Sequence, residues 1–289
     1  MELVSLLLWR FIMATLQEYR TREHWSYSNL NQFFNICSLQ WALQRFYKLA
    51  PAFTPVSLSF GSAFHRVMEW VYLNRKDNKP LAKVDAVALF DDLWGRQIEE
   101  DNNIRFDEDM DADSLAKQGR DMIACIVDVI DPVEHVIEIN EAFCVPLVDA
   151  QGNTLEKPLV GEIDMVVEKD GRKLVDWKTS ARRWPKNQAN NSMQPTVLLY
   201  AYKQLHGVEC GFRFDVVVKN KTPVFEQHET TRTQDQFNRV VELVKLADSM
   251  IAHEHFYPNE SSFYCGSCQF STACKAWHRN RNKLISLAA

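Results

Sequence analysis

The stretch GEIDMVVEKDGRKLVDWKTS, residues 161–180, has the pattern of two apolar strands around a turn, yet it carries Asp164, Asp176 and Lys178. Burying charged groups without partners is expensive, so an ordinary core hairpin would not contain three of them. Residues two apart in a strand face the same way, which puts Asp176 and Lys178 on one face. The hairpin therefore predicts a site with charged chemistry.

The turn decides whether Asp164 shares that face. A two-residue loop would set Asp164 opposite Trp177, on the other side of the hairpin. A three-residue loop, Lys169–Gly171, sets Asp164 directly opposite Asp176 and puts glycine at the left-handed third position, which suits it. The sequence favours the three-residue loop.

Directly opposed strand residues have Cβ atoms roughly 5 Å apart. Two carboxylates that close repel each other, and one protonates unless a cation lies between them. Hard oxygen ligands suit Mg²⁺ or Mn²⁺, and Lys178 beside the metal can stabilise a developing phosphorane charge or orient a water. These are the groups that the hydrolysis of a phosphodiester bond requires. The alternative is a surface hairpin with a solvated acidic pair and a Lys178–Asp176 salt bridge.

GEID and LVDWKTS resemble the paired metal-binding motifs of the PD-(D/E)xK nuclease superfamily, in its RecB-like branch. The resemblance implies that Asp164, Asp176 and Lys178 are catalytic and that the main-chain carbonyl of Trp177 completes the metal shell. It also implies that His65, in the G-x-x-x-H segment GSAFH, is a metal ligand.

RecB-like members carry a Q-x-x-x-Y helix after the lysine strand, which contacts DNA or supports the lysine. The nearest match here is QPTVLLY, in which Gln194 and Tyr200 are six positions apart, so a helix turns them to different faces. Thr196 occupies the position four before Tyr200. This is a departure from the family pattern, and Tyr200 and Gln194 remain site candidates.

Seven cysteines are present, and four of them have the spacing of ligands: a distant Cys37 and the C-x2-C-x5-C run of Cys265, Cys268 and Cys274. Four thiolates suit tetrahedral zinc and iron–sulfur equally well. The layout resembles AddB-like and CRISPR-associated RecB-like nucleases, which implies a [4Fe–4S] cluster that staples the chain ends together. Zinc is the alternative.

Basic residues follow both motif sets and predict contacts with DNA phosphates. Trp184, among the first set, is a candidate for stacking on a splayed base. For any single basic residue the alternative is solvated surface. The candidates are Arg182, Arg183 and Lys186 after the lysine strand, and Lys275, Arg279, Arg281 and Lys283 after the cysteines.

The 289 residues are 46% hydrophobic and 25% charged, as in a soluble globular protein with a substantial core. The net charge of −5 restricts any polyanion site to a local patch. An odd cysteine count argues against a disulfide framework, and the apolar N-terminus is too short to span a bilayer. We expect a cytoplasmic protein with no membrane partner, whose first twelve residues, before Met13, are an upstream extension.

Apolar periodicity predicts helices in residues 26–50, 61–75, 80–101 and 112–131, then strands from His135, a helix over 195–205, a strand over 212–220 and a helix over 235–252. The expected fold is α/β, with a restriction-endonuclease-like mixed central sheet flanked by helices, a helical N-terminal region and a C-terminal cysteine cluster. Residues 1–25 are an N-terminal extension. Residues 26–289 are a single nuclease domain: a helical part (26–134), a catalytic sheet core (135–230), and a helix with the cysteines and basic tail (231–289).

The resemblance thus implies a Mg²⁺- or Mn²⁺-dependent DNA nuclease, an exonuclease or end-processing enzyme of recombination, repair or CRISPR adaptation. A catalytically inactive DNA-binding or assembly subunit on the same scaffold is the alternative. No helicase P-loop (GxxxxGK[ST]) occurs in the sequence, so unwinding would require a partner. The expected partners are DNA and a helicase, recombinase or CRISPR-integrase protein.

Overall fold

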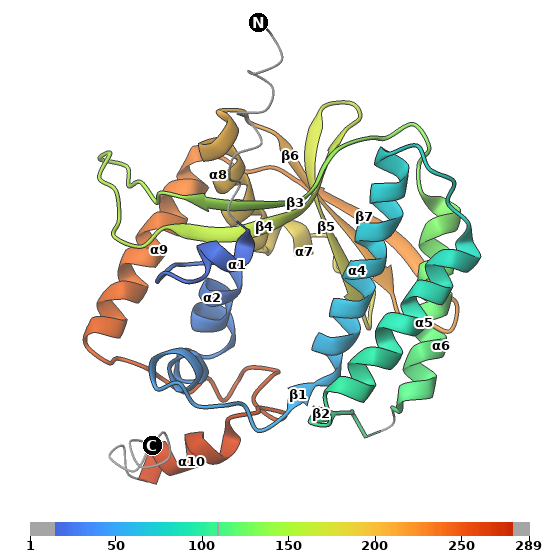
Figure 1. Ribbon diagram of the computed structural model, residues 1–289. Helices are drawn as coiled ribbons and strands as arrows, with labels where there is room; N and C mark the ends of the chain where they lie inside the picture. Colours follow the sequence, from blue (N-terminus) through green and yellow to red (C-terminus); the bar gives the residue numbers. More distant parts are fainter. Residues whose placement is uncertain (1–14, 109, 280–289) are drawn as a thin grey trace, which may run out of the picture.

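The computed structural model describes residues 15–108 and 110–279, and its framework is a five-stranded mixed sheet in the order β3-β4-β5-β6-β7 (Figure 1). Only the β5–β6 pair is parallel; the other three neighbouring pairs are antiparallel. The strands are β3 (His135–Val145), β4 (Leu159–Glu168), β5 (Arg172–Ser180), β6 (Gly211–Val218) and β7 (Val224–Thr230). A restriction-endonuclease-like mixed sheet is therefore confirmed.

Helices cover both faces of this sheet, and no described helix is long and apolar enough to cross a membrane. A small parallel pair, β1 (Thr54–Pro55) and β2 (Ile104–Arg105), lies apart from the main sheet. The helices are α1 (Leu16–Tyr19), α2 (Tyr27–Asn31), α3 (Ser38–Trp41), α4 (Val56–Lys76), α5 (Lys83–Glu100), α6 (Ala112–Val129), α7 (Gln188–Asn191), α8 (Gln194–His206), α9 (Gln234–Ala252) and α10 (Ser271–Arg279), with π-helical turns at Gln32–Ile36 and Ala42–Phe46.

The β4–β5 hairpin has the predicted three-residue turn. Glu168 pairs with Arg172, and the antiparallel register continues to Met165 and Val175. Gly171 has φ +102°, the left-handed conformation that glycine adopts without steric cost. Local turn chemistry therefore determines which residues of the two strands face each other.

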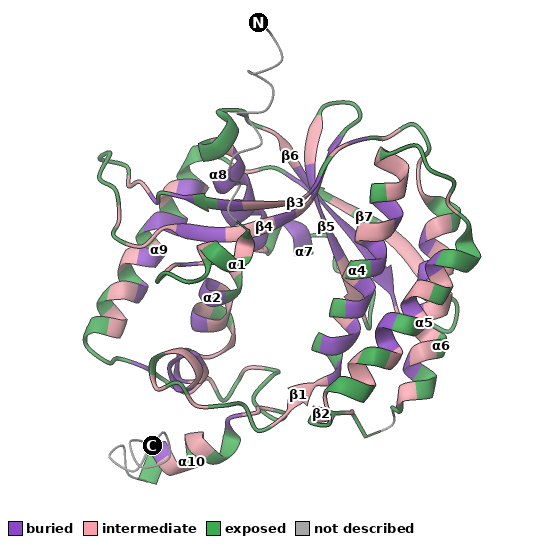
Figure 2. Cartoon of the chain, in the orientation of Figure 1, coloured by how far each residue is buried: buried purple, intermediate pink, exposed green. Residues whose placement is uncertain are grey.

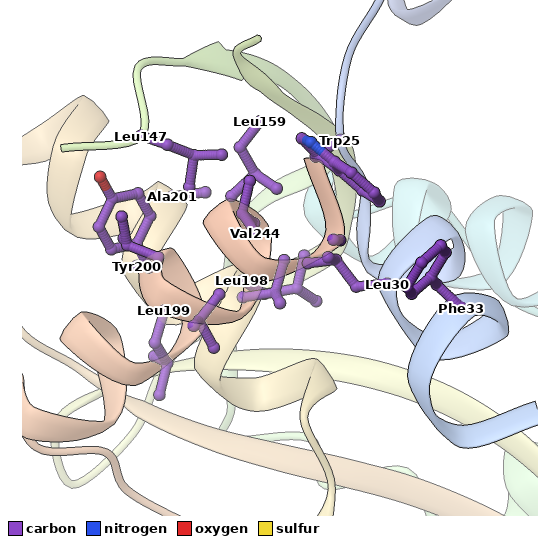
Figure 3. Close-up of a cluster of buried hydrophobic side chains, with 14 of the residues drawn as sticks. Trp25, Leu30, Phe33, Leu147, Leu159, Leu198, Leu199, Tyr200, Ala201 and Val244 are labelled. Atoms are coloured by element: carbon purple, nitrogen blue, oxygen red, sulfur yellow. The ribbon is translucent and has the colours of Figure 1, made fainter. Parts of the chain in front are cut away.

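Each face of the sheet has its own hydrophobic core. On one face α2, α3, α8 and α9 pack together, and Figure 3 shows Trp25 and Leu30 beside Leu198 and Val244 of the later helices. Trp25, the last residue of the predicted N-terminal extension, is only 2% exposed. On the other face α4, α5 and α6 cover the sheet, and the Trp177 ring stacks on Tyr72. Figure 2 shows the buried residues concentrated in and beside the central strands.

The sheet also contains a buried ionic network beside β5. Arg213 Nε lies 2.7 Å from Asp215 Oδ1, and Arg213 Nη1 lies 2.5 Å from Glu134 Oε1. All three side chains are at most 7% exposed. Burial raises the pKa of Asp215, and the Arg213 guanidinium opposes that rise. Each charge in the network therefore depends on its partner.

We expect Asp215→Ala to destabilise the protein by about 3–5 kcal/mol, because the substitution leaves the Arg213 charge buried and incompletely paired. The measurement is the free energy of unfolding in urea. The matched control is Glu229→Ala, whose pair with Lys173 at 2.6 Å is solvent-exposed and is expected to contribute less than about 1 kcal/mol. Equal losses in the two variants would contradict the role given to burial.

Candidate active site and cysteine cluster

Asp176 and Lys178 point to the α8 side of β5. Lys178 Nζ lies 2.6 Å from Asp176 Oδ2, and the Asp176 side chain is 4% exposed. The Gln194 amide, at the start of α8, donates a hydrogen bond of 2.5 Å to Asp176 Oδ1. The crossover between the parallel strands β5 and β6 thus delivers Gln194 to the second acidic residue.

Asp164 lies where β4 and β5 separate. The pairing of β4 with β5 runs from the turn to Met165 and Val175 and ends there, one residue short of Asp164. Beyond that point the Trp177 backbone N–H donates to Asp164 Oδ2 at 3.1 Å, and His65 Nδ1 of α4 lies 3.3 Å from the same oxygen. The structure therefore brings His65, Asp164 and the Trp177 backbone together beside the Asp176–Lys178 pair.

The charges of these groups are strongly coupled. Burial raises the pKa of Asp164 well above its ordinary value, and the neighbouring Asp176 carboxylate raises it further. Burial alone would lower the pKa of Lys178, but Asp176 and Asp164 outweigh it and the pKa rises. Burial lowers the pKa of His65 despite Asp176, so its imidazole is neutral at pH 7. The buried Asp176, the half-buried Asp164, the Lys178 ammonium and a neutral imidazole meet here.

This donor set fits a hard divalent cation. Among the described residues, no three His, Cys, Asp or Glu side chains already have the geometry of a complete metal site. Lys178 Nζ contacts Asp176 Oδ2 at 2.6 Å, yet burial and the Asp176 carboxylate still raise the pKa of Asp164, so a further positive charge would stabilise the ionised form of Asp164. Carboxylate oxygens with a neutral imidazole are ligands that Mg²⁺ and Mn²⁺ accept. The ligands would be Asp164, Asp176, His65 and the Trp177 carbonyl.

We expect Asp164→Asn to stabilise the metal-free protein at neutral pH by a few °C in melting temperature. The folded-state pKa of Asp164 lies above its unfolded value, so stability falls as pH rises from about 4 through the folded pKa. Asparagine cannot ionise, so the variant does not lose stability as the pH rises. The measurement is the melting temperature in EDTA between pH 4 and pH 8, and the advantage of the variant should shrink toward pH 4.

Asp149→Asn is the control of opposite sign. The Lys245 ammonium, and to a smaller extent the Asn153 backbone N–H, lower the pKa of Asp149. The ionised Asp149 carboxylate therefore stabilises the fold at neutral pH, and this stabilisation is lost as the pH falls. This variant should melt below the wild type at pH 7 and approach it in acid. An Asp164→Asn variant that melts at the wild-type temperature throughout the pH range would contradict the coupling inferred for the two acids.

Some predicted site residues lie away from these acids. The Tyr200 hydroxyl donates to the Pro146 carbonyl at 3.0 Å and accepts from the Val148 N–H at 2.8 Å, and the ring lies in the hydrophobic core beside Leu147 and Ala201 (Figure 3). The structure therefore brings Gln194, but not Tyr200, to the acids. Thr196 instead accepts from Arg232 Nε at 2.8 Å.

The basic candidates are more dispersed. Arg182, Lys186 and Arg279 are exposed, whereas exposed Arg183 forms an ion pair of 3.2 Å with Glu226. Trp184 is half-buried, with its ring centroid 4.9 Å from that of Phe214 and 5.5 Å from that of His228. The Trp184 ring is thus packed against two other rings of the protein. Arg281 and Lys283 lie outside the described residues.

Two groups near the acids were missed by sequence reasoning. Tyr27 of α2 interacts with both Lys178 and Asp176. Glu162, two residues before Asp164 on β4, has a pKa raised by burial and by Glu69 of α4. Glu69 stands one helical turn after His65, and that i, i+4 spacing was a readable signal. No comparable sequence signal marks Tyr27, because it lies more than a hundred residues before the acids in the chain.

The four cysteines of the predicted cluster are brought together. Burial raises the pKa of Cys274 to about 11, with further contributions from Cys37, Cys268 and Cys265. Cys37 has an extended backbone, φ −172°, between two helical turns, and its sulfur accepts from the N–H groups of Gln40 and Asn259 at 3.3 and 3.4 Å. The interruption of the N-terminal helix therefore turns this thiol toward the C-terminal loop.

Further contacts join the two parts of the cluster. Cys268 Sγ accepts from Gln40 Nε2 and from the Phe270 N–H, both at 3.4 Å. These contacts to sulfur tie the C-terminal loop to the N-terminal helices. Gln40 thus contacts both Cys37 and Cys268, although no three thiols among the described residues form a group that could hold a metal ion as they stand.

Comparison with known proteins agrees with this geometry. A model of the PD-(D/E)XK nuclease superfamily matches residues 24–275. No curated protein sequence matches the chain. The crystal structure of a protein described as a "Putative exonuclease" from Eubacterium rectale resembles the fold with a TM-score of 0.54 at 13% identity, over 89% of this chain and 93% of that one.

The structure of SSO0001 is more distant, with a TM-score of 0.34 and 14% identity over 47% of this chain and 58% of that one, and no argument rests on it. At such identities, structural likeness shows the fold alone. The family match spans both the hairpin acids and the cysteines, that is, most of the chain. This chain belongs to the PD-(D/E)XK nuclease superfamily.

Proposed function

We propose that this protein is a Mg²⁺- or Mn²⁺-dependent deoxyribonuclease of the RecB-like type that processes DNA ends. The observation that carries the proposal is the meeting of Asp164, Asp176 and Lys178 at the point where β4 and β5 separate, with His65 beside them. Membership of a nuclease superfamily supports a hydrolytic role for this arrangement.

Each residue has a distinct task in the proposed reaction. A divalent cation held by the acids and His65 would supply Lewis-acid stabilisation of the phosphate. Lys178, held 2.6 Å from Asp176 Oδ2, places a positive charge beside the reacting phosphate and can orient the attacking water. Gln194 fixes the Asp176 carboxylate through Oδ1 and so leaves Oδ2 directed at the site. His65 orients Asp164.

Exonuclease action is the preferred mode, because the structural neighbour of matching length carries that description. Four neighbouring thiols suit a [4Fe–4S] cluster or zinc equally, and the RecB-like resemblance favours the cluster, with zinc as the alternative. Seven unpaired cysteines fit a reducing, cytoplasmic compartment. Recombination, repair or CRISPR adaptation, with a helicase, recombinase or integrase partner, are the roles that the RecB-like resemblance suggests.

The alternative is a DNA-binding or assembly subunit that lacks hydrolytic activity. The displacement of Tyr200 from the acids favours this alternative, since RecB-like members have a tyrosine on that helix. The retained acids, lysine and histidine oppose it.

Digestion of end-labelled single-stranded and duplex DNA, with Mg²⁺, Mn²⁺ or EDTA, tests the proposal. Metal-dependent release of short labelled products from one end is expected. A closed circular substrate separates exonuclease from endonuclease action, because it offers no end. DNA binding without any metal-dependent cleavage, in protein that carries its full complement of thiolate-bound metal, would establish the alternative.

A further inference from the structure

Two adjacent aromatic side chains, Phe263 and Tyr264, are left on the surface just before Cys265. Phe263 is 91% exposed and Tyr264 is 56% exposed. Their ring centroids are 5.7 Å apart at an interplanar angle of 84°, so the rings contact each other edge to face. A single exposed apolar residue needs no explanation, but two neighbouring aromatics that face solvent are typical of a binding surface.

The loop that carries this pair is anchored on both sides. The Tyr257 N–H donates to Ser38 Oγ at 2.9 Å, and the Leu39 N–H donates to the Tyr257 carbonyl at 3.0 Å. After the pair, the Gln269 carbonyl accepts from the Ala52 N–H at 3.1 Å. Figure 1 shows the loop running from α9 past the N-terminal helices toward β1, which leads into α4. The loop that carries the pair is therefore held by α3 on one side and by the segment before β1 on the other.

Tyr27 connects this loop with the acids. It is the first residue of α2, and the backbone of Trp25 just before it pairs with Pro158 and Val160 beside β4. The half-buried Tyr27 phenol is hydrogen-bonded to Ser192 and interacts with Lys178 and Asp176 and also with Tyr264. Tyr27 is thus within electrostatic range of both the candidate catalytic pair and the surface loop.

We infer that Phe263 and Tyr264 form a stacking track that holds unpaired bases of the DNA strand processed at Asp176 and Lys178. This inference rests on the proposed function. Aromatic rings bind any base through its π-face, but only when the base is not stacked in a duplex. Exposed Lys275 and Arg279, one turn apart on α10 directly after Cys274, supply cations for the phosphates of the same strand. Trp184 instead packs against Phe214 and His228.

Binding without cleavage tests the inference. The full-length protein in EDTA is titrated with a fluorescent oligothymidylate and with an abasic strand of the same length and charge, and anisotropy is read. The wild type should bind the oligothymidylate more tightly. Phe263→Ala/Tyr264→Ala should lose about tenfold or more of that affinity, as expected for one or two lost stacking contacts, and should bind the abasic strand unchanged.

Single substitutions distinguish stacking from simple apolar contact. Tyr264→Phe keeps the ring and should bind like the wild type, whereas Tyr264→Leu keeps apolar surface without a π-face and should bind the oligothymidylate more weakly. The melting temperature and the metal content of each variant verify that the cysteine loop is intact. Both substituted side chains are exposed, so the fold should tolerate these changes.

The inference is overturned if the double alanine variant, intact by those criteria, binds the oligothymidylate as tightly as the wild type does; the pair would then be left to contact another protein. This failure is distinguishable from failure of the proposed function. A protein that binds bases through the pair but never hydrolyses DNA keeps the stacking track and loses the nuclease assignment. A protein that hydrolyses DNA with no dependence on the pair keeps the nuclease and loses the track.

Discussion

Replacing Asp176 by asparagine is expected to reduce DNA hydrolysis on the order of 10³-fold or more, the scale of losing a principal electrostatic element of an active site. Asp176 is 3% exposed and lies 2.6 Å from Lys178 Nζ. Asparagine retains the shape and the contact with Gln194 but removes the negative charge that a cation needs. The measurement is the initial rate of product release from end-labelled DNA at saturating Mn²⁺, with DNA binding measured in EDTA and expected to change little.

Asp215→Asn is the matched control, because Asp215 is equally buried, on the neighbouring strand, and belongs to the separate network with Arg213. It should lower stability yet leave the rate of the folded protein within about tenfold of the wild type. Gln194→Ala should have an intermediate effect of about 10–100-fold, as for other residues that orient a metal ligand. Undiminished metal-dependent hydrolysis by the Asp176→Asn variant would contradict the assignment of this site as the active site.

If the four thiols bind a metal centre as proposed, replacing Cys268 by serine is expected to remove it and to lower the melting temperature by more than about 10 °C, because such binding contributes on the order of 10 kcal/mol to folding. Cys268 accepts hydrogen bonds from Gln40 and Phe270, so it joins the N-terminal helices to the C-terminal loop. The measurements are metal analysis, absorption near 400 nm and thermal unfolding of anaerobically purified protein.

Cys144→Ser provides the control, since that exposed thiol on β3 is not among the four convergent cysteines. Its metal content and melting temperature should equal those of the wild type. If the protein is colourless and contains one zinc per chain, the four thiolates bind zinc rather than an iron–sulfur cluster. Anaerobically purified wild type without bound metal, and no more stable than the Cys268→Ser variant, would show that the thiols meet for packing alone.

The sheet and its central hairpin were predictable because their signals are local. The turn around Gly171 requires a left-handed residue, and strand periodicity of two then assigns each side chain to a face. The strand β7 was not predicted, since its sequence, VFEQHET, is mostly polar at an edge and lacks an apolar run. The short helix α10 was likewise missed behind the cysteines.

The site was only partly predictable. The two acids and Lys178 follow from the hairpin, but the strands separate after Met165 and Val175, and Asp164 turns to the Trp177 backbone and His65. Regular strand geometry cannot anticipate these contacts, because His65 comes from α4 and lies about a hundred residues before Asp164 in the chain. Trp184, a predicted stacking residue, packs on Phe214 and His228 for the same kind of reason.

Taken by itself, the sequence determined the strand register, the charged face of β5 and the presence of four ligand-type thiols, since each depends on neighbouring residues or on fixed spacing. Only the tertiary structure decided that Gln194 rather than Tyr200 reaches Asp176, that Tyr27 comes to Lys178, and that Cys37 meets the C-terminal cysteines. The physical reason is the separation of these residues along the chain. The packing of whole helices on a sheet brings distant residues together, and no local sequence pattern encodes which of them will be in contact.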